Sequence, residues 1–119
     1  MIPRDYQRAA VDAARAKTAA HGNTILMLPT GAGKTAVAGF YIGEEAEAQS
    51  NARILMLQHT DELVQQNLAA ISGITGLRSS IVKASQNDWT GKLVFGSVQT
   101  LARANRRADI GHISHLVID

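Results

Sequence analysis

The most constraining feature of the chain is a glycine-rich segment followed directly by a lysine and a threonine. It reads Pro29-Thr30-Gly31-Ala32-Gly33-Lys34-Thr35. Glycines let the backbone curl so that successive N–H groups face one anion, and a helix starting there adds about half a positive charge. The general phosphate-loop pattern fails at Leu28, where it requires glycine, but the tighter variant that begins proline-threonine-glycine is complete. The segment predicts a phosphate-binding loop, with Lys34 on the β- and γ-phosphates and Thr35 on Mg²⁺.

Short apolar runs alternate with helical patterns along the chain. The runs predict strands over residues 24–28, 52–57, 80–82, 92–95 and 116–118. The helical patterns cover residues 5–20, 34–48, 61–72 and 98–105, with a polar loop at 84–91. We expect residues 24–28 to be buried on both faces of a parallel sheet, and Gly39 and Gly43 to allow close packing of their helix on that sheet. The alternation predicts βαβ units, and therefore an α/β domain with helices on both faces of the sheet.

Composition narrows the class of protein. A length of 119 residues fits one domain, and the absence of cysteine excludes disulfides and thiolate zinc sites. The apolar runs are far shorter than a membrane span requires, and the amino terminus carries no apolar signal segment. We therefore expect a cytoplasmic protein that does not bind membranes. The net charge of +2 permits an anionic partner without requiring one.

The last residues, 115–119, form an apolar strand that ends in Asp119. An acid at the carboxyl end of a strand beside a phosphate loop can hold Mg²⁺ directly or through water. The alternative is that Asp119 merely ends the strand. Because the phosphate loop stands upstream, we favour the metal role.

Five stretches, in order, carry a resemblance to a known family. They are residues 4–7, 29–35, 57–66, 95–101 and 117–119. The chain resembles the first RecA-like domain of superfamily 2 helicases and translocases, the DEAD/DEAH-box-like group, and most closely its RadD-like and type III restriction-subunit-like branch. The resemblance implies a three-layer RecA-like P-loop NTPase domain with a mainly parallel sheet, of which residues 1–119 form the front part. It implies ATP and Mg²⁺ as cofactors.

The resemblance also implies roles for individual residues. Lys34 and Asp119 become the catalytic candidates, and Arg4 and Gln7 the candidates for reading adenine. Gln7 otherwise reads as a solvated residue of the first helix. The implied nucleic-acid contacts are His59, Thr60, Ser97, Gln99 and Thr100. The competing interpretation is that Thr60 caps the third helix, and that the group at 97–100 caps the fourth.

Three arginines, at positions 103, 106 and 107, fit a solvated basic face and a phosphate-contacting patch equally well. Trp89 fits an anchor for its polar loop better than a platform for stacked bases.

In activity, the resemblance implies a motor that couples ATP hydrolysis to movement on single- or double-stranded nucleic acid, with DNA favoured over RNA. The family's general base follows the aspartate of its second ATPase motif, and its arginine fingers come from a second RecA-like domain. Both lie outside residues 1–119, so we expect this chain to bind nucleotide without turnover. A compact P-loop NTPase or phosphotransferase and a non-catalytic nucleotide-binding module stay open as alternatives.

Overall fold

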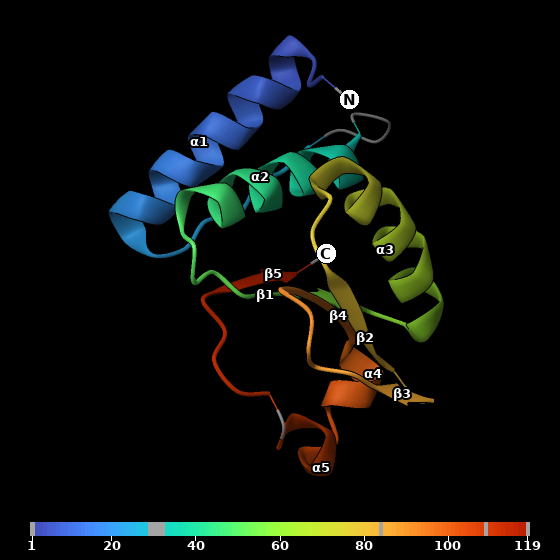
Figure 1. Cartoon of the computed structure of the whole chain (residues 1–119). Helices are drawn as coiled ribbons and strands as arrows, with labels where there is room; N and C mark the ends of the chain where they lie inside the picture. The colour runs from blue at the N-terminus through green and yellow to red at the C-terminus, as the bar shows by residue number, and fades with distance from the viewer. Residues whose placement is uncertain (1, 29–32, 84, 109, 119) are drawn as a thin grey trace.

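A computed structural model describes residues 2–28, 33–83, 85–108 and 110–118, apart from the side chains of residues 104 and 106. The chain folds as an α/β domain (Figure 1). The elements are α1 (Asp5–His21), α2 (Lys34–Ala48), β1 (Ile54–Gln58), α3 (Asp61–Thr75), β2 (Ser79–Lys83), β3 (Gln86–Asn87), β4 (Leu93–Ser97), α4 (Val98–Leu101), α5 (Ala104–Arg107) and β5 (His115–Ile118). The predicted α/β class is confirmed, and no helix in these ranges is long and apolar enough to cross a membrane.

One five-stranded sheet carries the fold, in the order β3-β2-β4-β1-β5. Neighbours among β2, β4, β1 and β5 are parallel, and the short β3 is antiparallel to β2. The register aligns the strand ends: Ile54 of β1 lies opposite Leu93 of β4 and His115 of β5. The carboxyl ends of the parallel strands therefore meet at one edge of the sheet, and their amino ends at the other.

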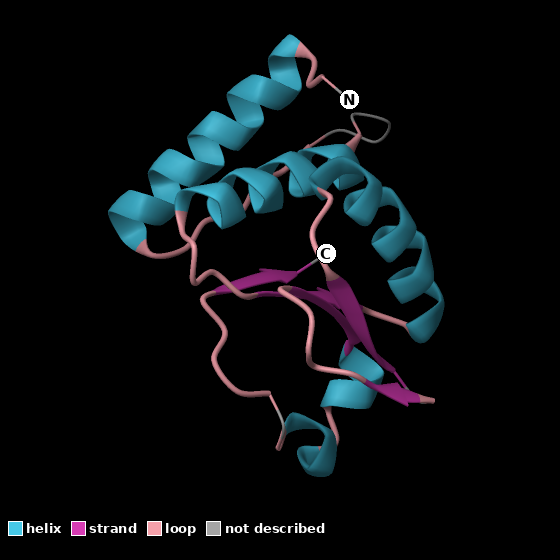
Figure 2. Ribbon diagram, in the orientation of Figure 1, coloured by secondary structure: helices cyan, strands magenta, loops and turns pink. Residues whose placement is uncertain are grey.

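Helices cover both faces of the sheet (Figure 2). Helices α2 and α3 lie over one face, where apolar side chains from both helices pack against β1, β2 and β4. The other face is covered by α4 and by residues of the loops before β4 and β5. Helix α1 forms an outer layer, because its Val11 packs on Val37 and Phe40 of α2 and not on the sheet. The core therefore holds α2 between α1 and the strands.

The strand predicted at residues 24–28 is wrong. These residues are extended but join no ladder, and three of their apolar side chains are exposed: Ile25 at 89%, Leu26 at 40% and Met27 at 88%. The run lies along the same cavity as the edge strand β5 without pairing with it. Five apolar residues are too few for periodicity to distinguish a buried strand from an extended connection.

Three smaller expectations also need correction. Gly39 and Gly43 approach α3, not the sheet: a Cβ on Gly39 would stand 3.0 Å from Cδ1 of Ile74, and one on Gly43 would stand 3.5 Å from Cγ2 of Thr75. The helix expected over 98–105 is two short helices, α4 and α5. The loop expected at 84–91 contains β3, because a pair of polar residues extends the sheet beyond β2.

Candidate nucleotide and nucleic-acid sites

Helix α2 begins where the glycine-rich segment ends. Gly33 is its N-cap residue, with a left-handed backbone (φ 74°) that a side chain would strain, and its carbonyl accepts the N–H of Val37 at 3.0 Å. Lys34 and Thr35 form the first turn, with Lys34 exposed and Thr35 half-buried. No acidic residue stands in that turn. The positive end of the α2 dipole is therefore left without a local counter-charge, which suits an anion.

Gln7 packs against this helix start. It is 7% exposed, its Oε1 accepts the backbone N–H of Arg4 at 2.9 Å, and its Nε2 would lie 2.7 Å from a Cβ on Gly33. A Cβ at position 33 would crowd this amide, and the left-handed backbone there also favours glycine. The alternative of a solvated Gln7 is therefore wrong, whereas adenine contact by Gln7 and the exposed Arg4 stays a prediction.

A cavity of about 760 Å³ opens beside the first turn of α2. Lys34 and Thr35 line it together with Ala14 and Thr18 of α1, residues 24–26 and 28, and every residue of β5. Its volume falls within the few hundred to about 1,000 Å³ typical of small-ligand sites. The cavity thus brings the lysine and threonine of the loop to the strand that leads to Asp119. Asp119 itself and Pro29, Thr30, Gly31 and Ala32 lie outside the described residues.

The carboxyl edge of the sheet gathers the predicted nucleic-acid contacts. Gln58 of β1 lies opposite Ser97 of β4, so His59 and Thr60 leave the sheet beside the start of α4. His59 and Gln99 are exposed, and Thr60 is half-buried. Thr60 is the N-cap residue of α3, but its side chain makes no capping hydrogen bond, so the expected hydroxyl cap is wrong.

Ser97 and Thr100 are buried at that edge. The Ser97 hydroxyl is fully buried and accepts the N–H of Thr100 at 3.1 Å, which confirms that it caps α4. The Thr100 hydroxyl, 6% exposed, donates to Asp61 Oδ1 at 3.3 Å. These hydroxyls join β4, α4 and α3 to one another. Nucleic-acid contact at this edge would fall to the exposed His59 and Gln99, which stays a prediction.

Trp89 and Arg107 have assigned partners. Trp89 is 7% exposed, packs with Leu55 and Val94, and donates its indole N–H to Asn87 Oδ1 at 3.0 Å, so it anchors its loop as predicted. Arg107 donates to the carbonyls of Leu101 and Ala102, closing the turn between α4 and α5. No group of three acidic, histidine or cysteine side chains in the described residues could hold a metal ion.

An ion-pair network between α1 and α2 escaped sequence reasoning. Arg8 binds both carboxylate oxygens of Glu44, at 2.6 and 2.7 Å, and also Asp12. Arg15 reaches Glu44 and Glu45. The spacing of Arg8 and Arg15, seven residues apart, was the available signal, because it sets both on one helix face. The Arg8 guanidinium lowers the pKa of Glu44 below its ordinary value of 4.5. The network holds α1, which lines the 760 Å³ cavity, against α2.

The same network reaches the sheet. His115 of β5 lies with its Nε2 3.5 Å from Glu45 Oε2, and its Nδ1 is 2.7 Å from the Ser114 hydroxyl. Both side chains of the His115–Glu45 pair are nearly buried. His115, the first residue of β5, is therefore tied to α2, the helix that begins with Lys34.

Comparisons with known proteins agree with this geometry. The backbone is similar to that of the Type ISP restriction-modification enzyme LlaGI, in a solved structure of a nuclease-deletion mutant with a DNA substrate mimic. The TM-score is 0.76 at 17% identity, over 100% of this chain and 15% of that one, so this likeness concerns the fold alone. None of the curated proteins compared with the chain is significantly similar to it. The family described as "Type III restriction enzyme, res subunit" matches residues 1–119. The chain therefore belongs to that family, and its domain is of the helicase-like ATPase kind.

Proposed function

We propose that the chain is the ATP-binding front part of a nucleic-acid-dependent ATPase that moves along DNA or RNA. One observation carries the proposal: Lys34 and Thr35, at the start of α2, line one cavity with β5. Family membership makes an ATPase site the natural use of that arrangement. The chain spans 15% of the length of the LlaGI chain. Movement along nucleic acid, which would need a longer protein, is therefore also part of the proposal.

Residues of this chain fit ATP and Mg²⁺. The uncompensated helix start and the left-handed Gly33 suit phosphate oxygens, and the cavity is large enough for a nucleotide. We assign the phosphates to residues 29–35, with Lys34 on the β- and γ-phosphates, and Mg²⁺ to Thr35 and Asp119. Bound Mg²⁺ would neutralise charge on the phosphate oxygens. Arg4 and Gln7 would contact adenine.

We expect the 119 residues to bind ATP without turning it over. In P-loop ATPases an arginine finger adds about 10³- to 10⁵-fold in rate, and in this group a second domain supplies it. Residues 1–119 contain the front part of one such domain. ATP would then act in a longer protein by closing two domains on each other.

Calorimetric titration with ATP and Mg²⁺ tests nucleotide binding. Lys34→Ala should weaken binding at least about tenfold, because charge-assisted hydrogen bonds contribute about 1.5–3 kcal/mol. Lys17→Gln, an exposed charge loss on α1, is the matched control and should bind like the wild type. Equal affinity of the Lys34→Ala and Lys17→Gln proteins would refute the site. Weaker binding of GTP than ATP, lost in Gln7→Ala, would support the adenine contact.

Fluorescence anisotropy with labelled single-stranded DNA, duplex DNA and RNA tests the nucleic-acid partner. We expect weak binding that falls with salt, favours DNA and decreases in a His59→Ala, Gln99→Ala double variant. Binding of ATP without affinity for any of the three probes would instead favour a compact P-loop phosphotransferase.

A further inference from the structure

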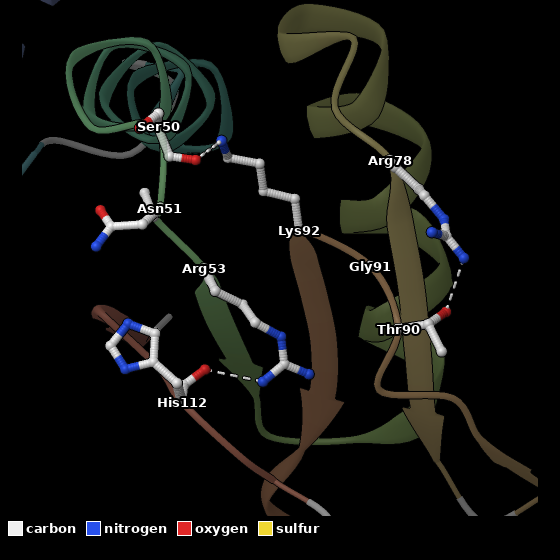
Figure 3. A pocket seen from close by; sticks show the side chains of 9 residues that line it. Ser50, Asn51, Arg53, Arg78, Thr90, Gly91, Lys92 and His112 are labelled. Carbon is white, nitrogen blue, oxygen red and sulfur yellow. Dashed lines mark hydrogen bonds between the residues drawn. The ribbon is translucent and has the colours of Figure 1, made fainter.

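A second cavity, of about 320 Å³, lies at the amino edge of the sheet, opposite the edge that gathers the predicted nucleic-acid contacts. Four basic residues line this cavity, one from the segment that precedes each of four neighbouring strands. Three of them stand immediately before the first residue of the strand, and the fourth lies in the loop before the strand. In sheet order these are Arg78 before β2, Lys92 before β4, Arg53 before β1 and His112 before β5 (Figure 3). Adjacent strands lie about 4.8 Å apart. The topology thus makes a row of basic side chains that are distant in sequence.

Arg53 is held rigidly in the middle of this row. Its Nη1 donates to the carbonyls of Ile110 and His112, at 2.6 and 2.9 Å, and its Nη2 donates to the carbonyl of Trp89. Neutral carbonyls fix the guanidinium but do not cancel its charge. In the described part of the chain Arg53 makes no ion pair.

Lys92 and Arg78 use few of their donors within the described part of the chain. There Lys92 Nζ donates once, to the Ser50 carbonyl at 3.2 Å, and the guanidinium of Arg78 donates once, to the Thr90 hydroxyl at 3.1 Å. An ammonium has three N–H donors and a guanidinium five. A phosphate oxygen entering the cavity would therefore find donors without breaking these bonds.

The positive charge of the basic side chains at the cavity exceeds the negative charge of the groups around them. Among the described residues, none of those that line the cavity carries a carboxylate. The carboxyl ends of α2 and α3 lie nearby, and each contributes about half a negative charge. Asp88 adds one more: its pKa is lowered first by hydrogen bonds from Thr90 and then by the charge of Arg78. Within the described residues, about two negative charges thus face the three cations Arg53, Arg78 and Lys92, which leaves about one positive charge over.

We propose that this cavity binds a phosphate group. Its volume is at the lower limit of small-ligand sites, which suits one phosphate with its waters better than a whole nucleotide. The phosphate can belong to free inorganic phosphate or to a nucleic-acid backbone. In either case the site is separate from the phosphate loop, and it does not depend on the proposed ATPase function.

NMR titration of the Lys34→Ala protein with inorganic phosphate, at constant ionic strength, tests the proposal without competition from the phosphate loop. The amide signals of Thr90, Gly91 and Lys92 should shift and saturate. Lys92→Gln and Arg78→Gln, each made in this background, should weaken phosphate binding by about tenfold. Lys17→Gln removes the same charge from exposed α1 and should leave it unchanged. Arg53 is left intact because it ties two loops together.

A parallel titration with a twelve-residue thymidine oligonucleotide separates the two sources of phosphate. Loss of oligonucleotide affinity in Lys92→Gln and Arg78→Gln, in step with the loss for phosphate, identifies a nucleic-acid backbone. Loss for phosphate alone identifies free phosphate. The proposal is overturned if phosphate shifts none of these signals, or if Lys17→Gln weakens binding as much as Lys92→Gln.

Discussion

Gln58 offers the sharpest test of the energetics of the fold. It ends the inner strand β1, is 0% exposed, and neither Nε2 nor Oε1 has a hydrogen-bond partner among the described residues. Burying an amide without a partner costs about 1–3 kcal/mol in protein mutational data. Methionine has a similar length and adapts to irregular gaps, so repacking should cost less than about 1.5 kcal/mol. We therefore expect Gln58→Met to raise the free energy of unfolding by about 1–2 kcal/mol.

Urea denaturation followed by circular dichroism measures this change. For a domain of this size the gain corresponds to roughly 3–10 °C in Tm. Gln58→Ala removes the same amide but leaves a cavity, so it should be less stable than Gln58→Met by about 2–5 kcal/mol. Gln65→Met makes the same chemical change at an exposed position of α3 and should stay within about 0.5 kcal/mol of the wild type.

Gln58→Glu adds a pH readout. A buried carboxyl has a raised pKa, so its cost appears as pH rises through that value and should be larger at pH 7 than at pH 4.5. Destabilisation by Gln58→Met at an unchanged denaturant m-value would refute the reasoning. It would mean that the Gln58 amide is hydrogen-bonded in the folded protein.

Three further predictions follow from the contacts above. Ser97→Ala should cost about 1 kcal/mol in urea unfolding, because it removes the hydroxyl that caps α4. The stability difference between wild type and Glu44→Gln should be fully present above pH 4.5 and shrink as pH falls through the lowered folded-state pKa; a difference that grows on acidification would contradict the pairing with Arg8. Gly91→Ala should cost about 1–3 kcal/mol, because its Cβ would stand 2.7 Å from the backbone of β2. In contrast, Gly73→Ala on an open face of α3 should stabilise by up to about 1 kcal/mol.

The long helices and the inner strands could be predicted because their signals are local. Helix α1 was expected over 5–20 and ends at His21, with Gly22 (φ 84°) closing it as its C-cap. Strands β1 and β4 are apolar runs with nearly every side chain buried. Period and end signals are encoded within a few residues, so a single sequence is enough to identify such elements.

Features that depend on partners distant in sequence could not be predicted in this way. Gln7 reads as a surface residue of α1, but in the fold it is 7% exposed and lies beside Gly33, which is distant in sequence. Ser97 could cap α4 or contact a ligand with the same hydroxyl, and its burial decides for the cap. The row of basic residues at the amino edge comes from four separate segments that only the strand order brings together.

The run at 24–28 shows where local signals fail, and it changes how the nucleotide site is supported. In a parallel sheet the strand before a phosphate loop can fix the position of that loop. Here the segment before the loop, residues 24–28, lies along β5 without pairing with it. Lys34 depends instead on α2, which packs on α1 through Val37 and on the strands through Ile42. The Arg8–Glu44 pair adds a polar tie between α1 and α2, and the Gln7 side chain packs beside Gly33 at the start of α2. Lys34 is therefore positioned by helix packing, so substitutions between α1 and α2 should affect nucleotide affinity more than substitutions within residues 24–28.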